Sequence, residues 1–364
     1  MAAGGQGKRR RWRLGFAGFG NVHRALARLL LDRREELLRR HRLAFDVTFV
    51  ASARRGAWVD PGGVDLERAL AGDWSSPLPA LEAIKTAAID LLFEATPLDP
   101  RAGEPATSHV RAALERGVSV VTANKGPLAF AARELLEIAR RTGAGLRFES
   151  AVADCLPVFD LVETAVPVGR VTGFRGVLNS TSNHALQALA RGASVEAAVE
   201  EMRRLGFAEA DPSYDLDGWD QAAKAVILAN VLLGRDLRPA DVERVPLSEV
   251  DTGWLRVECA AGHVVRLGAA GRLEGPVRVQ PLSLQPGEFL ASLGGISLGL
   301  TLETEPAGTI NVSTVDPGVE QTAYGMLTDL VAIHQGRLIV PTPLAIPPGP
   351  GAGPRSGTGR PGVP

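Results

Sequence analysis

The sequence predicts an α/β protein in which a doubly wound parallel sheet is followed by a second, α+β domain. Three observations lead to this prediction. Between residues 12 and 150, short apolar runs alternate with amphipathic helical segments, which is typical of a parallel sheet covered by helices. A glycine turn follows the first apolar run. Residues 263–284 are rich in Val and Leu with turn glycines, as expected for further strands.

Composition limits the classes of protein to consider. The chain has 364 residues, 45% of them hydrophobic, and a formal net charge of −1, so it can bury a sizeable core and indicates no polyanionic partner. Cys155 and Cys259 are far apart, which fits a reducing compartment and gives no metal-ligand spacing. No apolar run reaches the length of a membrane helix. We therefore expect a soluble, cytoplasmic protein with a small-molecule ligand and neither membrane nor nucleic acid as partner.

The first elements lie in residues 13–41, which predict a buried strand, a glycine turn and an amphipathic helix. Gly18 and Gly20, followed by Asn21 and Val22, would let the backbone approach a pyrophosphate at the helix N-terminus, as in a Rossmann-type dinucleotide fold. The third position of this fingerprint is normally Gly or Ala, but here it is His23. An ordinary strand–turn–helix corner is the alternative.

A second strand, residues 45–55, ends at the place where such folds bind the adenosine ribose. An NAD-binding protein usually has Asp or Glu there, whereas this chain has Ser52, Arg54 and Arg55. Guanidinium and hydroxyl groups suit a 2′-phosphate, so the sequence favours NADP(H) over NAD(H). The alternative is two exposed arginines in a loop.

The alternation continues to residue 150. Strands are predicted within 88–97, 118–124 and 146–150, and helices within 108–117 and 132–143. Ligands of parallel sheets bind at the carboxyl ends of the strands. The residues expected to converge on one crevice for this reason are Gly20, Ser52, Thr96 and Lys125.

Residues 173–189 place the small polar residues Asn179, Ser180, Thr181 and Asn183 between a strand and a helix. Hydroxyl and backbone N–H groups at a helix start can bind a substrate carboxylate. Capping of the helix is an equally good explanation. Residues 194–206 then form an amphipathic helix that leads into an acidic stretch.

The acidic stretch, residues 205–224, contains Glu209, Asp215 and Asp220 and ends at Lys224. A helix from 218 to about 233 is predicted, with Asp217 as its N-cap. Asp220 and Lys224 lie four residues apart on one face of an apolar helix. A lysine kept charged by a carboxylate away from water suits proton transfer to a substrate oxygen. The alternative is a surface ion pair.

Five motifs together resemble the homoserine dehydrogenase family, and the resemblance runs from about residue 14 to about residue 333. They are GFGNV (18–22), VTANKGPLA (121–129), ESAVADCLP (149–157), NSTSN (179–183) and GFAEADPSYDLDGWDQAAK (206–224).

The resemblance implies roles for individual residues. Lys125 and Lys224 would flank the reacting carbonyl, and Glu209 and Asp220 would hold the substrate's amino group. Thr181 would lie in the substrate pocket, to which we also assign Ser180 and Asp215. Glu149 and the backbone of Val152 resemble the family's sodium site, and Gly318 matches the end of a late glycine turn near the nicotinamide. A homodimer formed through the strands of the second domain is also implied.

The chain departs from the family at three places. His23 stands in the glycine turn, Asp154 and Cys155 stand where small residues including Gly are usual, and the late turn reads DPG (316–318). These departures affect cofactor affinity and the metal site more than the fold. We expect a short form of the family without a C-terminal regulatory domain.

We expect the chain to divide into four segments. These are a basic tail at 1–11, a nucleotide domain at 12–150 to which 311–335 returns, a substrate and dimerisation domain at 151–310, and a Pro/Gly-rich tail at 341–364.

The predicted reaction is hydride transfer between NAD(P)H and L-aspartate 4-semialdehyde, giving L-homoserine, a step of threonine and methionine biosynthesis. Lys224 is the expected proton donor, and Lys125 is a second ammonium that could share or take this role. The alternatives are another Rossmann-type amino acid aldehyde dehydrogenase, and a catalytically silent NADPH-binding dimer. The intact Glu209, Asp220 and Lys224 weigh against the silent protein.

Overall fold

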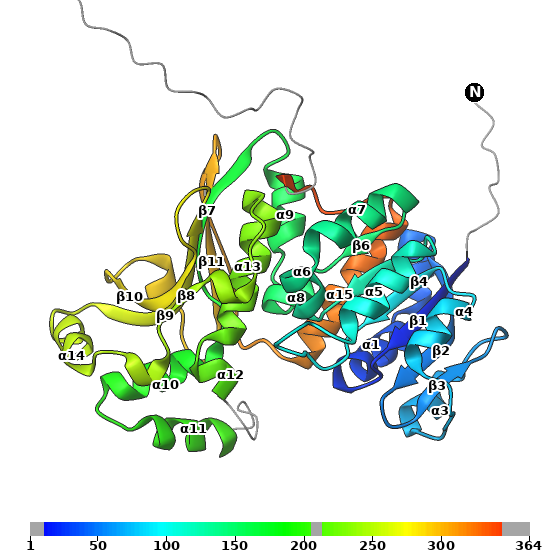
Figure 1. Cartoon of the computed structure of the whole chain (residues 1–364), viewed down its shortest axis with the longest axis horizontal. Helices are drawn as coiled ribbons and strands as arrows, with labels where there is room; N and C mark the ends of the chain where they lie inside the picture. The colour runs from blue at the N-terminus through cyan, green and yellow to red at the C-terminus, as the bar shows by residue number, and fades with distance from the viewer. Residues whose placement is uncertain (1–10, 205–212, 344–364) are drawn as a thin grey trace, which may run out of the picture.

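The structure, a computed structural model, describes residues 11–204 and 213–343. Its helices surround two six-stranded sheets (Figure 1). The first sheet has the order β3-β2-β1-β4-β5-β6, and all its strands are parallel except β3, which is antiparallel to β2. The predicted Rossmann-type parallel sheet is therefore confirmed. Its strands are β1 (Arg11–Ala17), β2 (Ala44–Ser52), β3 (Gly56–Val59), β4 (Leu91–Glu94), β5 (Ser119–Thr122) and β6 (Leu146–Arg147).

Helices cover both faces of this sheet. On one face, α1 (Asn21–Asp32) and α15 (Val319–His334) pack against each other and bury Leu26, Met326 and Leu330 against Phe16 and Phe93. On the other face, α4 (Ala80–Thr86), α5 (Ala106–Glu115) and α7 (Ala132–Thr142) bury a second apolar layer. The remaining helical segments around this sheet are α2 (Arg34–Glu36), η1 (Leu37–His41), α3 (Leu66–Ala71) and α6 (Lys125–Phe130).

The second sheet has the order β12-β11-β7-β9-β10-β8 and is antiparallel except between β10 and β8. The strands predicted within 263–284 are present as β9 and β10. Its strands are β7 (Arg170–Val177), β8 (Glu243–Arg244), β9 (Val264–Arg272), β10 (Arg278–Leu284), β11 (Leu298–Glu305) and β12 (Gly308–Thr314). The helices associated with it are α8 (Ser150–Ala153), α9 (Val158–Ala165), α10 (Ser180–Ala190), α11 (Val195–Arg204), α12 (Ser213–Leu216), α13 (Trp219–Leu233) and α14 (Thr252–Ala260), with short 3-10 turns at Pro239–Asp241, Leu247–Glu249 and Phe289–Ser292.

Helix α13 lies between the two halves of the molecule. It packs against β7, β9 and β10 on one side and against α6, α7 and α8 on the other (Figure 1). An apolar surface around the whole helix explains this position, because such a helix must be covered on all sides. Asp220 and Lys224 on its first turns are thereby carried into the space between the two sheets.

The start of α13 differs from the prediction. Asp217 is not its N-cap: the helix begins after Gly218, which has a left-handed backbone (φ 78°), and no side chain caps it. The carbonyl oxygen of Asp217 instead accepts a hydrogen bond from Arg244. The tight turn needed to enter the buried helix requires the positive φ that glycine adopts without strain, and it leaves the Asp217 side chain no capping role.

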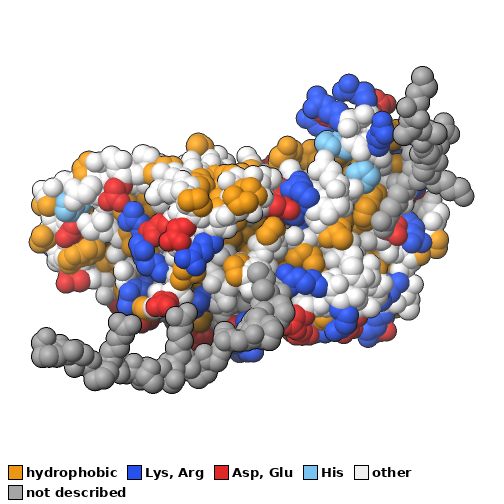
Figure 2. Space-filling model, turned by 90° about the horizontal axis from the view of Figure 1, so that it is seen from above, with side chains coloured by type: hydrophobic (Ala, Val, Ile, Leu, Met, Phe, Trp, Pro, Cys, Tyr) orange, Lys and Arg blue, Asp and Glu red, His pale blue; other side chains and the backbone are white. Residues whose placement is uncertain are grey.

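On the face shown in Figure 2, basic and acidic side chains are interspersed, in keeping with the balanced charge of the chain. Within the two described ranges, no helix is both long and apolar enough to span a bilayer.

Candidate active site

Asp220 lies between two lysines that come from different parts of the chain. Its Oδ2 is 2.9 Å from Nζ of Lys224, one turn further along α13, and its Oδ1 is 3.4 Å from Nζ of Lys125, at the start of α6. The side chains of Lys224 and Asp220 are only 12% and 10% exposed. The predicted ion pair is present, and its burial is incompatible with the alternative of a surface pair.

The charges of this group stabilise one another. Burial by itself would raise the pKa of Asp220, but Lys224 and Lys125 outweigh it and hold that pKa well below its usual range. Burial would lower the pKa of Lys224, yet the Asp220 carboxylate more than offsets this, so the pKa is raised. Asp220 and Lys224 are therefore both charged at neutral pH.

Asn179 joins this group to the acidic stretch. Its amide nitrogen donates to Asp215 Oδ1 at 2.9 Å and to Asp220 Oδ2 at 3.0 Å, and its amide oxygen accepts from the backbone and hydroxyl of Ser182 at 2.8 Å. Burial and the nearby Asp220 raise the pKa of Asp215 to about 6. The sequence predicted Asn179 as a polar residue at the start of this helix, but not its bonds to two carboxylates, because these depend on the tertiary fold.

A pocket of about 350 Å³ opens beside these groups. Lys125, Asp215 and Asp220 line it, whereas Lys224 is not among the lining residues. Tyr214 also lines it and was missed from the sequence. Burial, followed by the two carboxylates, raises the pKa of the Tyr214 phenol, so its hydroxyl stays protonated and can donate a hydrogen bond. The other lining residues are Pro97, Leu98 and Pro100.

The glycine turn fits a pyrophosphate. Gly18 has a φ of +90°, and a Cβ there would lie 2.7 Å from the backbone of Ala95 and Thr96, so only glycine fits. Helix α1 begins after Gly20 with no side-chain cap, and Gly20 and Asn21 are exposed. The first N–H groups of α1 are therefore left for an anion. Val22, the next predicted contact, is partly buried under the same turn.

A buried network supports the neighbouring strand ends. Glu94 is fully buried at the end of β4 and accepts hydrogen bonds from Thr96 and from the Thr122 hydroxyl. Asn124 donates to the Thr96 carbonyl at 2.8 Å and, with its side-chain oxygen, caps the helix that begins at Lys125. Thr96 and Lys125, predicted to share a crevice, are thus physically connected. Glu94 and Asn124 were missed because a strand-end Glu and a cap Asn are common without function.

Sequence comparison decides the family. The model of the NAD-binding domain of homoserine dehydrogenase matches residues 18–149, and the model of the homoserine dehydrogenase family matches residues 157–331. The chain belongs to the homoserine dehydrogenase family. It is an NAD(P)-dependent oxidoreductase acting on the CH–OH group of homoserine, and a role in threonine and methionine biosynthesis follows from the family.

Individual relatives of this homoserine dehydrogenase agree. An NAD(+)-dependent homoserine dehydrogenase of Pseudomonas canavaninivorans is 35% identical, over 89% of this chain and 96% of the relative. The enzyme of Methanocaldococcus jannaschii is 30% identical, over 87% of this chain and 97% of its own. Among solved structures, a putative homoserine dehydrogenase of Archaeoglobus fulgidus has a TM-score of 0.81 at 31% identity, covering 89% of this chain and 99% of that one. A hyperthermophilic archaeal homoserine dehydrogenase in complex with NADPH has a TM-score of 0.76 at 26% identity, covering 90% and 98%.

The two predicted cofactor arginines of the homoserine dehydrogenase have different surroundings. Both are exposed at the end of β2. The guanidinium of Arg55 donates to the Trp74 carbonyl at 3.4 Å and lies against Gly72, where a Cβ would be 2.8 Å from its Nη2. Arg55 is therefore drawn toward the loop after α3, which leaves Arg54 as the arginine free to meet a phosphate.

His23 lies in the core of the dehydrogenase. Its side chain is fully buried with its ring against Phe16 and Phe93, at centroid distances of 5.1 and 6.4 Å. Burial lowers its pKa to about 3, with the Gly18 backbone opposing only in part. The imidazole thus packs as a neutral ring beneath the glycine turn and does not reach the surface where a cofactor phosphate would lie.

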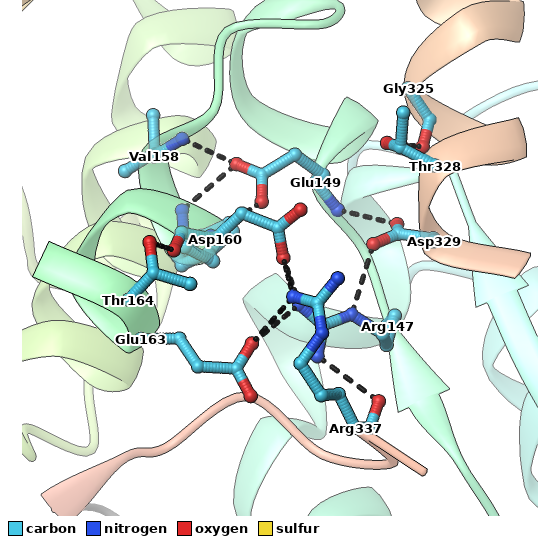
Figure 3. A network of polar contacts seen from close by, with 11 residues as sticks. Arg147, Glu149, Val158, Asp160, Glu163, Thr164, Gly325, Thr328, Asp329 and Arg337 are labelled. Carbon is cyan, nitrogen blue, oxygen red and sulfur yellow. Dashed lines mark hydrogen bonds and ion pairs between the residues drawn. The ribbon is translucent and has the colours of Figure 1, made fainter. Parts of the chain in front are cut away.

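Glu149 is surrounded by hydrogen-bond donors. Its carboxylate accepts from the backbone N–H groups of Val158, Phe159 and Asp160 at the start of α9, and its own N–H donates to Asp329 at 2.9 Å (Figure 3). Burial, with Asp329 adding to it, raises its pKa to about 8. Val152 is buried in α8. A hard cation needs a shell of acceptor oxygens, so these contacts do not fit a sodium ion.

The remaining predicted residues lie as follows. Ser180 and Thr181 form the first turn of α10, and the side chain that caps this helix is that of Asn179. Gly318 is the residue before α15. Glu209 lies outside the described residues.

Proposed function

We propose that Lys224, Lys125 and Asp220 carry the proton chemistry of the homoserine dehydrogenase reaction. The observation that supports this is the pair of ammonium groups on a single buried carboxylate beside the pocket. Asp220 keeps Lys224 charged, and ammonium groups near a carbonyl oxygen stabilise the alkoxide that forms during reduction.

The residues at the strand ends fit NAD(P), as the close approach at Gly18 and the uncapped start of α1 indicate. When bound, the cofactor supplies or accepts the hydride at the substrate's aldehyde carbon. The protein's own residues transfer the proton to and from the substrate oxygen. As the carbonyl electrons move to oxygen, an ammonium gives that oxygen a proton, and in the reverse direction the neutral amine takes it back. We assign this proton transfer to Lys224. Lys125, which lines the pocket, is the group that could share or take over this role.

The acidic side chains suit the other end of the substrate. Asp215 and Asp220, both within reach of Asn179, offer negative charge to the substrate's ammonium group, and Glu209 is proposed for the same role on the resemblance alone. Ser180 and Thr181 are proposed to meet the substrate carboxylate at the start of α10.

For the cofactor we propose a preference for NADP(H), contacted by Arg54 and, more weakly, by Arg55, with Asn21, Val22, Thr96 and Gly318 along its length. The exposed Arg54 at the end of β2 supports this. A 35% identical relative is named as NAD(+)-dependent, and an archaeal relative was solved with NADPH. We propose no step that involves sodium, since the contacts of Glu149 do not fit the ion.

The division of the chain near residue 150 and the return of α15 to the first domain are proposed on the two sheets and on the packing of α15 against α1. The return begins later than the predicted residue 311, because β12 (Gly308–Thr314) is a strand of the second sheet. A homodimer is proposed through the second sheet. Helices α10, α13 and α14 pack against β9, whereas the edge strand β12 is largely exposed and is the part of the sheet proposed for the dimer contact. Sedimentation velocity would test the dimer. Cytoplasmic location stays a prediction.

One assay tests the reaction. Purified protein is incubated with L-homoserine and either NADP or NAD, and the absorbance of the reduced cofactor is followed. The expected result is reduction of both cofactors, with the higher kcat/KM for NADP. Absence of turnover in folded protein with either cofactor would overturn the proposed roles.

A further inference from the structure

Asp154 has a backbone conformation that L-residues rarely adopt. Its φ is 56° and its ψ is −111°, outside the left-handed helical region as well as the common ones. It follows α8 directly, at a position where the family resemblance leads us to expect a small residue such as glycine. Strain of this kind persists only where the surroundings enforce it, and it is concentrated at functional sites.

The side chain of Asp154 bonds to the first turn of α15. Its Oδ1 accepts a hydrogen bond of 2.6 Å from the hydroxyl of Thr322. The carbonyl of the same threonine accepts from the hydroxyl of Ser150 at 2.9 Å. Helix α8 and the residue after it therefore hold Thr322 from two sides.

The helices also touch through their backbones. A Cβ at Gly325 would lie 2.3 Å from Ser150 Oγ and 2.9 Å from the Asp154 carbonyl oxygen, so α15 rests directly on this segment. Gly318, which begins α15, accepts the backbone N–H of Thr322 at 3.1 Å. The position of Gly318 and of the turn before it is thus linked to Asp154 through Thr322.

Asp154 also faces the catalytic group. Helix α8 packs against α13, and the negative charge of Asp154 is one of those that help to raise the pKa of Lys224. The carboxylate is therefore bonded to the first turn of α15, whose start is assigned to the nicotinamide end of the cofactor, and is near enough to Lys224 for its charge to act on that lysine.

We propose that Asp154 is a positioning residue, whose carboxylate latches the first turn of α15 through Thr322 and so fixes the nicotinamide side of the cofactor site relative to Lys224. A glycine at 154 would relieve the strain but lose the latch. This inference rests on the proposed function, because it uses the roles given there to Lys224 and Gly318.

The test compares Asp154→Gly and Thr322→Val with the parent enzyme. Both should raise the KM for the oxidised cofactor and weaken binding of the reduced cofactor, measured by its fluorescence, by about tenfold, as expected for loss of a hydrogen bond to a charged group. The KM for homoserine should change less than threefold. Asp154→Gly should keep the parental thermal midpoint because relieved strain offsets the lost bond, whereas Thr322→Val should lower it.

The double variant should lose no more than Thr322→Val alone, because both changes break the Asp154–Thr322 bond and only Thr322→Val also removes the 3.1 Å contact of the hydroxyl with the Gly318 carbonyl. Thr328→Val is the matched control, since its hydroxyl bonds the Gly325 carbonyl on the same helix without touching Asp154. Cofactor constants within twofold of the parent for both Asp154→Gly and Thr322→Val would overturn the latch. A parent that binds cofactor but does not oxidise homoserine would overturn the proposed function instead, and the fluorescence titration would still decide the latch.

Discussion

The active site and the cluster around Arg147 are both groups of charged side chains inside the protein, but positive groups outnumber negative ones around Asp220, and negative groups outnumber positive ones around Arg147. At the active site, one carboxylate lies between two ammonium groups. In the Arg147 cluster, the fully buried guanidinium of Arg147 lies among the carboxylates of Asp160, Glu163 and Asp329 and also donates to the Arg337 carbonyl (Figure 3). The partly exposed guanidinium of Arg337 pairs with Asp160 and Glu163 as well, so two cations meet three carboxylates. Every guanidinium nitrogen of Arg147 is thus engaged. The Arg147 cluster ties together β6, α9 and α15, whereas the Asp220 group borders a pocket and has ammonium protons to offer a ligand.

The comparison predicts the largest kinetic effect at Lys224. Replacing it with Met keeps most of the apolar stem and removes the ammonium. Since a general acid is commonly worth about 10²–10⁴ in rate, kcat should fall within that range while cofactor affinity stays nearly constant. The measurement is steady-state kinetics on protein shown to be folded by circular dichroism.

The control for Lys224→Met is Lys85→Met, which removes an exposed lysine paired with Glu82. That variant should keep its turnover within threefold of the parent. If the turnover of Lys224→Met also stays within threefold of the parent, the proton transfer is assigned to Lys125. The variant Lys125→Met should then show the loss of turnover.

Arg147 should respond in stability instead of kinetics. Arg147→Met leaves the buried Asp329 without its cation, while Asp160 and Glu163 keep Arg337 at 3.0 and 3.3 Å. Breaking a buried ion pair in this way costs about 3–5 kcal/mol. The midpoint of urea unfolding should fall accordingly, while kcat of the folded fraction changes little. Arg170→Met, which breaks an exposed pair with Glu305, should leave the midpoint nearly unchanged. A large loss of kcat at full stability in Arg147→Met would erase the distinction between the two clusters.

A pH dependence should distinguish the two carboxylates next to Asn179. The pKa of Asp215 is raised to about 6, so its charge is lost as the pH falls through that value, whereas Asp220 stays ionised because its pKa is lowered. If Asp215 attracts the substrate's ammonium, the KM for homoserine should rise about tenfold for each pH unit below 6. Asp215→Asn should have a raised KM that no longer depends on pH in this range. A parental KM that is constant from pH 5 to 7 would argue against Asp215 as a substrate contact.

The smallest expected effect concerns the cofactor arginines. Arg54→Met should raise the KM for NADP about tenfold and leave that for NAD nearly unchanged, because a phosphate contact to Arg is charge-assisted. Arg55→Met should have less than a threefold effect, since its guanidinium is already bonded to Trp74. Equal changes for both cofactors would contradict the NADP preference.

Local patterns were enough to predict most of the first sheet and the Asp220–Lys224 pair, because strand alternation, helix periodicity and an i,i+4 spacing are all properties of short segments. The antiparallel strand β3 was not predicted. It is short, and it becomes a strand only by pairing with β2. The contact between Lys125 and Asp220 joins distant parts of the chain, and only the family resemblance brought the two together in advance.

Tertiary contacts explain the other differences. Asn179, Tyr214 and Glu94 are residue types that occupy caps, loops and strand ends in many proteins, and their site contacts exist only once distant segments of the chain lie together in the fold. Asp217 was predicted to cap α13, but the helix begins after Gly218 and has no side-chain cap. Glu149 has the sequence context of a metal ligand, but the fold surrounds it with the N–H groups of α9.

Strand β6 is completed from a distant part of the chain. Leu146 pairs with Ile339 and donates to the Leu338 carbonyl at 2.8 Å, and α15 supplies Met326 and Leu330 to the apolar layer over α1. A ribosome therefore releases the strands of the first sheet, and then the whole second sheet, before the helix that covers the first one emerges. During that interval the part of this apolar face that α1 does not cover is exposed, which is a hazard for aggregation. The two halves of the enzyme are accordingly expected to finish folding together, after synthesis has passed residue 339, and to depend on chaperones until then.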